Sequence, residues 1–125
     1  MKTYRFPFSV AYSDTDAGGI VYHGRYIEIA ERARMEMLRG IVDFNGNDGG
    51  FVVSSLEIKY MSPLKLADDL VVETEITKVG AVSMNLEQKF VHNDTICAIM
   101  KISVAYIGPD MHLRAIPESI LAHLS

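Results

Sequence analysis

Residues 14–26 gather several reactive side chains into one short segment. The segment reads DTDAGGIVYHGRY and holds two carboxylates, Asp14 and Asp16, and the imidazole of His23. Carboxylates and imidazoles act as metal ligands and as general acids or bases, and a carboxylate can also be a nucleophile. Three interpretations therefore have to be compared: a metal site, a plain turn and a catalytic site.

The spacing of the ligands does not support a metal site. A calcium loop beginning at Asp14 needs an oxygen ligand at its fifth position and a glutamate at its twelfth, where this sequence has Gly18 and Arg25. A zinc site around His23 needs further convergent ligands, and the other histidines lie at no helical or knuckle spacing from it. We therefore expect no metal.

The turn and the catalytic site both fit the residues of this segment. Asp14 and Asp16 can form Asx turns, with Gly18 and Gly19 supplying positive φ angles. The order of carboxylate, glycines, histidine and helix start also places unpaired backbone N–H groups and the positive end of a helix dipole near His23. Such groups can bind the oxyanion that forms on an attacked carbonyl, and glycines let a substrate approach. This order favours a hydrolytic site at Asp16, whereas Asp14 can be turn alone.

The helix that must follow this segment is predicted over residues 25–39, ending near Gly40. Apolar residues recur at the spacing of one helix face, at Tyr26, Ile29, Ala30, Ala33 and Met37. Glu28, Glu31, Arg32 and Glu36 lie elsewhere on the helix. This pattern predicts a single amphipathic helix that covers one face of a sheet.

Alternating apolar residues predict the strands of that sheet. The strands are expected near 3–11, 51–61, 69–79, 82–92 and 95–107. Short connections favour antiparallel neighbours, residues 43–50 read as a mobile loop, and the tail from Pro117 reads as a helical turn. We therefore expect one α+β domain over residues 1–125, with a five-stranded antiparallel sheet and one long helix.

Composition narrows the classes of partner. The net charge is −4, from 12 basic and 16 acidic residues without a basic run, which disfavours nucleic acid. No apolar run approaches the roughly 18 residues of a spanning helix. A single cysteine, Cys97, and the lack of a signal-peptide pattern predict a cytoplasmic protein. The hydrophobic fraction of 49% is high for a small monomer, so we expect a homo-oligomer, at least a dimer.

Several longer segments resemble a known family. YSDTDAGGIVYHGRYIEIAERARMEML resembles the active-site signature of the hotdog-fold acyl-CoA thioesterases of the 4-hydroxybenzoyl-CoA thioesterase type, most of all their YbgC-like branch. FVVSSLEIKYMSPLKLADDLVVETEITKVG is similar to that family's second and third strands, and LRAIP also matches. The resemblance implies a sheet wrapped around one central helix and a homodimer with a continuous sheet, or a homotetramer. It is also the sole basis for a link to the Tol-Pal system.

The resemblance further implies an activity. An acyl-CoA thioester is expected to be hydrolysed to free acid and CoA, with no cofactor apart from the CoA of the substrate. The catalytic carboxylate of the family corresponds to Asp16, and its oxyanion donor corresponds to the backbone N–H near His23. Asp16 can attack the thioester or activate a water molecule as general base, and the sequence fits both roles. We expect His23 to have a supporting role.

The remaining candidates surround the reacting group. Gly19, Tyr22 and Gly24 are expected to lie beside the bound thioester, and Tyr22 also matches the YbgC-like branch. Met61 and Ser62 are candidates for the lining of an acyl pocket, which is expected to use strands of two subunits and the 43–50 loop. Arg114, within the matching LRAIP, is a candidate ligand of the CoA phosphates.

Two other functions are weighed against hydrolysis. One is a hotdog dehydratase acting on 3-hydroxyacyl thioesters, but in this sequence the carboxylate precedes the histidine, which is not the order of those enzymes. The other is a non-catalytic acyl-CoA-binding or scaffold protein, which has no need of Asp16 and the glycines after it.

Overall fold

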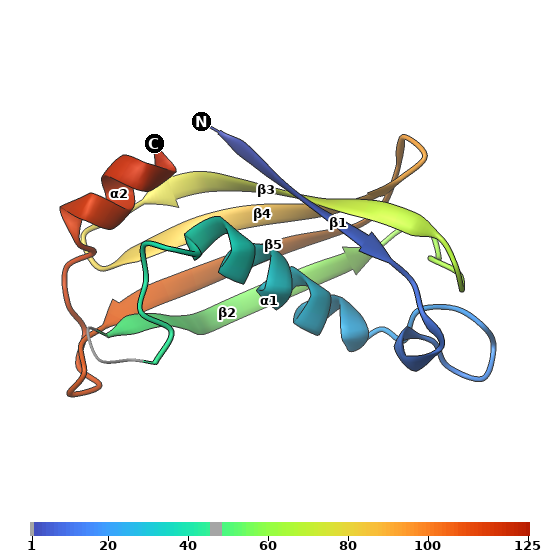
Figure 1. Cartoon of the computed structure of the whole chain (residues 1–125), viewed down its shortest axis with the longest axis horizontal. Helices are drawn as coiled ribbons and strands as arrows, with labels where there is room; N and C mark the ends of the chain where they lie inside the picture. The colour runs from blue at the N-terminus through green and yellow to red at the C-terminus, as the bar shows by residue number, and fades with distance from the viewer. Residues whose placement is uncertain (1, 46–48) are drawn as a thin grey trace.

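The chain folds into one antiparallel sheet of five strands that curls along one long helix (Figure 1). The computed structural model describes residues 2–45 and 49–125, so the centre of the expected 43–50 loop lies outside the described residues. In chain order the elements are β1 (Thr3–Ser9), the 3-10 turn η1 (Tyr12–Asp14), α1 (Arg25–Leu38), β2 (Gly50–Tyr60), β3 (Asp69–Val79), β4 (Ser83–His92), β5 (Thr95–Ile107) and α2 (Glu118–Leu124). The predicted helix and strands are all present, with closely matching boundaries.

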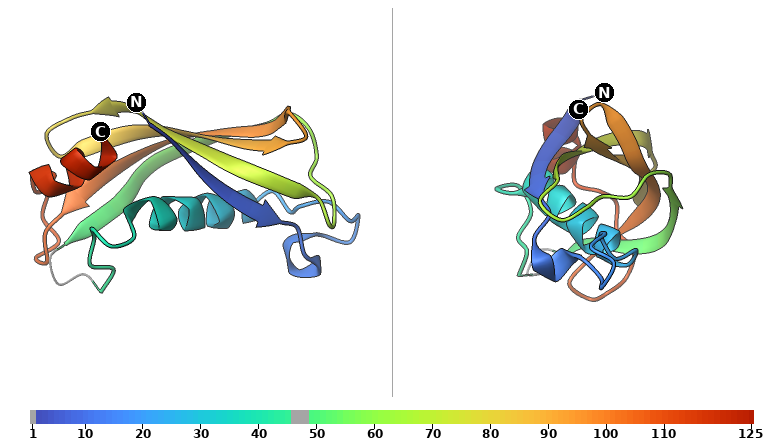
Figure 2. Two further views of the ribbon diagram at one scale, coloured as in Figure 1. Left: turned by 45° about the horizontal axis from the view of Figure 1, so that its top comes forward. Right: turned by 90° about the vertical axis from the view of Figure 1, so that its right-hand side faces the viewer.

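Helix α1 lies along the concave side of the sheet, as the two views of Figure 2 show, and the core lies between them. All five apolar residues predicted for the helix face are buried. They pack with inward-facing strand residues that include Val72, Leu86, Phe90 and Met100. Gly40 follows the helix with a φ of +87°, which ends α1 where the sequence predicts. The apolar periodicities therefore identified both faces of this interface.

The order of the strands differs from one sequence prediction. Short connections favour each strand lying beside the next, but the sheet order is β1-β3-β4-β5-β2, so β2 pairs with β5 and not with β3. The period-2 pattern shows which side chains face the core and carries no information on which strand is adjacent. As a result, β1 and β2 are the two edges of the sheet.

The β2 edge leaves apolar side chains uncovered. Val53, Leu56 and Tyr60 lie opposite buried residues of β5, so they face the same side of the sheet as α1. Their exposed fractions are nevertheless 47%, 38% and 47%. The helix therefore covers β2 only in part, and an apolar strip remains along this edge.

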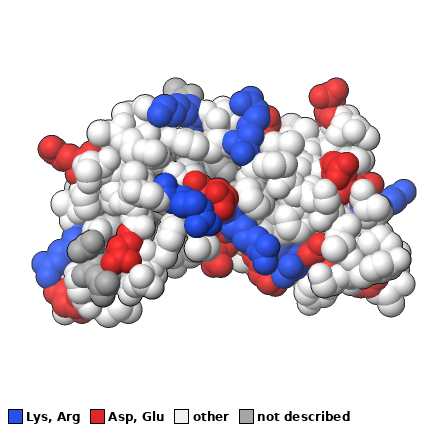
Figure 3. All heavy atoms as spheres, in the orientation of Figure 1, with Lys and Arg blue, Asp and Glu red and all other residues white. Residues whose placement is uncertain are grey.

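The surface carries charges of both signs. On the face shown in Figure 3, basic and acidic side chains alternate in small groups. Within the described residues, no helix has the length and apolar character needed to cross a membrane.

Candidate active site

Residues 14–22 form a small hairpin that leads into α1. The N–H of Asp16 donates to the carbonyl of Ile20 at 2.9 Å, and the N–H of Gly19 donates to the carbonyl of Asp16 at 3.0 Å. Gly19 has a φ of +78°, a conformation that glycine adopts without strain. The tight turn therefore places Asp16 on the hairpin rather than in an extended loop.

Asp14 fastens this hairpin to the start of the helix. Its side chain is only 3% exposed. One carboxylate oxygen accepts a hydrogen bond from Nε of Arg25 at 2.7 Å, and the other accepts one from the N–H of Ala11 at 2.8 Å. The carbonyl of Asp14 also accepts from the N–H of Tyr22 at 3.0 Å. The hydrogen bond to Asp14 raises the pKa of Arg25. Asp14 is thus a structural residue, as its turn interpretation predicts.

Asp16 is exposed and uses only part of its hydrogen-bonding capacity. Its Oδ1 accepts a hydrogen bond from the N–H of Gly18 at 2.8 Å, which is an Asx turn. Among the described residues, Oδ2 of Asp16 has no hydrogen-bond partner. The side chain therefore shapes the turn with one oxygen and leaves the other accessible to a ligand.

Two backbone N–H groups at the start of α1 are available. The N–H of Tyr22 donates to Asp14, and that of Arg25 donates to the carbonyl of Tyr22 at 2.9 Å. Between them, the N–H groups of His23 and Gly24 make no hydrogen bond within the described residues. Gly24 is the N-cap of α1, and no side chain of residues 2–45 or 49–125 caps it. Free N–H groups at the positive end of a helix dipole are suited to bind a developing oxyanion.

The side chains around these N–H groups pack closely. The rings of Tyr22 and His23 lie with centroids 4.3 Å apart. A Cβ atom on Gly24 would lie 2.9 Å from Cε2 of Tyr22. Gly24 therefore gives the Tyr22 ring its place beside the helix start, and the structure brings these three candidates together.

The end of β2 reaches the same place. The hydroxyl of Tyr60 donates to the carbonyl of His23 at 2.7 Å, and its ring packs edge-on against Tyr26 with centroids 5.1 Å apart. Met61 and Ser62 follow directly, so they leave the sheet at the helix-start end. The chain thus gathers every candidate except Arg114 at one end of the molecule.

Arg114 lies at the opposite end of the sheet. It follows β5, whose last residue, Ile107, pairs with Gly50 at the start of β2. At about 3.3 Å per residue, the 11 residues of β2 put this end roughly 35 Å from Tyr60. The guanidinium of Arg114 pairs with Asp110. Within one chain, Arg114 is therefore not part of the Asp16 site.

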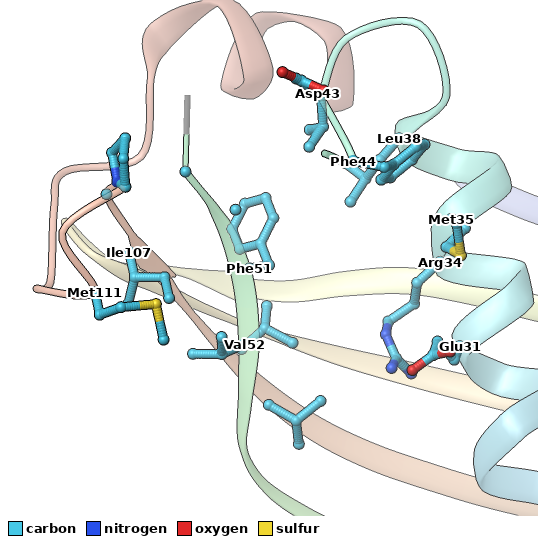
Figure 4. Close-up of a pocket in the computed structure, with 17 residues that line it drawn as sticks. Glu31, Arg34, Met35, Leu38, Asp43, Phe44, Phe51, Val52, Ile107 and Met111 are labelled. Atoms are coloured by element: carbon cyan, nitrogen blue, oxygen red, sulfur yellow. The ribbon is translucent and has the colours of Figure 1, made fainter. Parts of the chain in front are cut away.

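An apolar pocket also lies away from Asp16, between the second half of α1 and the first half of β2 (Figure 4). Its volume is about 620 Å³, within the range of small-molecule sites. Its apolar walls include Met35, Leu38, Phe44, Phe51, Val53 and Met111. Residues on both sides of the predicted 43–50 loop contribute to this pocket, whereas Met61 and Ser62, the sequence candidates for the lining of an acyl pocket, do not.

A polar network supports one wall of this pocket. The guanidinium of Arg34 donates to Oε1 of Gln88 at 3.0 Å, and burial lowers the pKa of Arg34. The amide of Gln88 donates in turn to the carbonyl of Ala30 and to the hydroxyl of Thr74, at 3.0 and 3.1 Å. Gln88 is fully buried, so this network ties α1 to the centre of the sheet.

Sequence reasoning missed several of these residues. In the sequence, Tyr60 is one apolar residue in the alternating pattern of the 51–61 strand, and Arg25 is only an unsuitable calcium ligand. The strand pattern could have indicated Gln88, because it is a polar residue at an inward position between Leu86 and Phe90. Nothing in the sequence distinguishes Arg34, since an arginine next to an apolar helix face is common.

Comparison with known sequences identifies related proteins. The family model described as the thioesterase superfamily matches residues 18–99. The chain is 38% identical to the acyl-CoA thioester hydrolase YbgC of Escherichia coli, over 95% of this chain and 93% of that protein. It is also 38% identical to the acyl-CoA thioesterase YbgC of Haemophilus influenzae, over 95% of this chain and 92% of that protein.

Solved structures show the same architecture. A probable thioesterase from Bartonella henselae superposes with a TM-score of 0.84 at 29% identity, covering 93% of this chain and 100% of the other. A 1,4-dihydroxy-2-naphthoyl-CoA thioesterase from Synechocystis superposes with a TM-score of 0.88 at 18% identity, covering 98% and 96%. The hotdog fold implied by the sequence is thereby confirmed.

Proposed function

The chain belongs to the thioesterase superfamily and is a thioester hydrolase, and we propose that it hydrolyses acyl-CoA to free acid and CoA at the start of α1. The observation that carries this proposal is the pair of N–H groups on His23 and Gly24 that have no partner among the described residues, next to a hairpin that holds Asp16. One oxyanion donor contributes about 2.7–4 kcal/mol in comparable acyl-transfer sites.

Asp16 supplies the carboxylate of the reaction. It either attacks the thioester carbonyl, giving a mixed anhydride that water opens, or removes a proton from the water that attacks. Its accessible Oδ2 fits both routes. The CoA thiolate leaves without assistance, because a thiol of pKa about 8.5 is a good leaving group. His23 therefore supports the site through its backbone N–H and its contact with Tyr22.

The acyl group occupies the apolar pocket of a second copy of the chain. Two copies that join antiparallel along the β2 edge cover its exposed apolar strip and remove an unpaired sheet edge. This symmetry sets the start of one β2 beside the end of the other. The pocket and Arg114 of one protomer thereby approach the Asp16 hairpin of its partner, which allows Arg114 to contact the CoA phosphates.

The proposed reaction uses no cofactor other than the CoA of the substrate. The substrate brings its own CoA, and the single cysteine of the chain, Cys97, is buried, with a pKa raised by that burial. We assign the activity to the cytoplasm, in keeping with this cysteine usage.

Release of free CoA tests the proposal directly. The protein is incubated with a panel of short-chain and aromatic acyl-CoAs, and a thiol reagent detects the product. Catalytic release from at least one substrate is expected. An unsaturated thioester formed from a 3-hydroxyacyl-CoA without free CoA would indicate a dehydratase, and bound but unaltered substrate would indicate a binding protein. Either result would overturn the assignment.

A further inference from the structure

The hydrogen bond between Tyr60 and His23 acts on the peptide group that carries the N–H of Gly24. The hydroxyl of Tyr60 donates to the carbonyl of His23 at 2.7 Å. That carbonyl and the N–H of Gly24 belong to the same planar peptide unit, and in a trans peptide they point in opposite directions. A hydrogen bond on the carbonyl therefore fixes the direction of the Gly24 N–H.

We propose that Tyr60 is a positioning residue that orients and polarises the Gly24 N–H for the oxyanion of the thioester. Hydrogen bonds in a chain strengthen one another, because a carbonyl that accepts a bond makes the N–H of its peptide a better donor. The Gly24 N–H makes no hydrogen bond within the described residues, so its donor capacity is free for the substrate. This inference rests on the hydrolysis proposed above.

Tyr60 is itself held in a defined place. Its ring meets Tyr26 edge-on at an interplanar angle of 83°, and Tyr26 in turn packs edge-on against the fully buried Phe90 with centroids 5.1 Å apart. Partial burial also raises the pKa of Tyr60. A tyrosine phenol is protonated at neutral pH, so it can donate this hydrogen bond. The aromatic cluster thus links the helix start to the core of the sheet.

The location of Gly24 leaves this N–H open on the substrate side. Gly24 has a helical backbone conformation, with φ of −70° and ψ of −20°, and no side chain in the described part of the chain caps the helix there. The Tyr22 ring occupies the space that a Cβ on Gly24 would need. Tyr60 and Tyr22 therefore act on different sides of the same residue: Tyr60 on the preceding carbonyl, and Tyr22 beside the Cα.

The first test compares two tyrosine-to-phenylalanine variants by steady-state kinetics. Tyr60→Phe keeps the ring and its contact with Tyr26 but removes the donor, so kcat is expected to fall about tenfold with KM unchanged, less than on loss of a direct oxyanion donor. Tyr4→Phe is the matched control, because the Tyr4 hydroxyl also contacts a histidine carbonyl, that of His123, far from the site. We expect Tyr4→Phe to keep wild-type kcat.

The second test does not depend on activity. In ¹H–¹⁵N NMR spectra, the Gly24 amide proton is expected to move upfield in Tyr60→Phe and to stay in place in Tyr4→Phe. An unmoved Gly24 resonance, or a kcat within twofold of wild type, would overturn the role of Tyr60. If the wild-type protein released no CoA, the proposed function would fail while the NMR result still decided whether Tyr60 acts on Gly24.

Discussion

The two aspartates of the hairpin lie two positions apart and have opposite surroundings. Asp14 is buried, and both of its carboxylate oxygens are hydrogen-bonded within the chain. Asp16 is exposed, and within the described residues it uses one oxygen. A carboxylate whose oxygens are all engaged can neither attack nor accept a proton readily, so the hydrogen bonding supports the roles proposed for the two aspartates.

The role of Asp16 is tested by Asp16→Asn. An asparagine keeps an Oδ1 that accepts from the N–H of Gly18, so the turn is expected to persist and the variant to fold. The variant loses the nucleophile or general base, and CoA release is expected to fall at least about a hundredfold. Turnover near the wild-type level in the folded variant would refute the assignment. His23→Ala keeps the backbone N–H, and we expect it to lose less activity.

Asp14 is expected to affect stability more than chemistry. Asp14→Ala removes the partner of the Arg25 guanidinium and of the Ala11 N–H, and we expect the free energy of unfolding to fall by about 2–3 kcal/mol. Urea denaturation monitored by circular dichroism measures this change. Glu28→Ala is the control, because Glu28 is the exposed partner of Arg25, and exposed ion pairs contribute about 0–1 kcal/mol. Equal losses in the two variants would contradict this ranking.

The helix and the sheet are joined by both apolar packing and a buried polar network. Gln88 lies at the centre, between the guanidinium of Arg34 and the backbone of α1 on one side and Thr74 on the other. A buried network is stabilising only when all of its members have partners. The contact between α1 and the sheet therefore depends on the hydrogen bonds of Gln88 as well as on apolar packing.

A double-mutant cycle tests this dependence. Gln88→Leu removes the hydrogen-bond partner of Arg34 and is expected to lower the free energy of unfolding by about 2–4 kcal/mol. Arg34→Met in the same chain is expected to restore much of the loss, because replacing both partners with apolar groups costs little. Chemical denaturation of both single variants and the double variant gives the coupling free energy between Gln88 and Arg34. Strictly additive losses would show that the two side chains are independent.

The sequence predicted the elements better than their arrangement. Periods of 3.6 and 2 depend on which side chains face the core, so they identified α1 and all five strands. The position of β2 next to β5 depends on pairing between distant segments, which short connections did not reveal. At the site, residue types indicated Asp16 and His23, whereas the contact of Tyr60 with a backbone carbonyl exists only once the chain is folded.

The complete enzyme is expected to be a dimer formed along β2. Leu56→Glu places a charge in the apolar strip on the helix side of this edge, so we expect the dimer to dissociate and activity to fall with it. Sedimentation velocity measures the change in mass. Lys59→Glu is the control, since Lys59 pairs with Ile99 on the other face of the same strand. A monomeric wild-type protein, or an intact Leu56→Glu dimer, would contradict this arrangement.

The position of β2 at the edge also has a genetic consequence. If each site takes Asp16 from one protomer and the pocket from the other, Asp16→Asn and a pocket-filling Met35→Trp damage different halves of a shared site. Random re-pairing of the two inactive variants makes about half of the dimers mixed. One of the two sites in each mixed dimer is intact. About a quarter of the wild-type activity is therefore expected to return. Complementation between two defective copies of one gene is thus expected from the order of strands in its sheet.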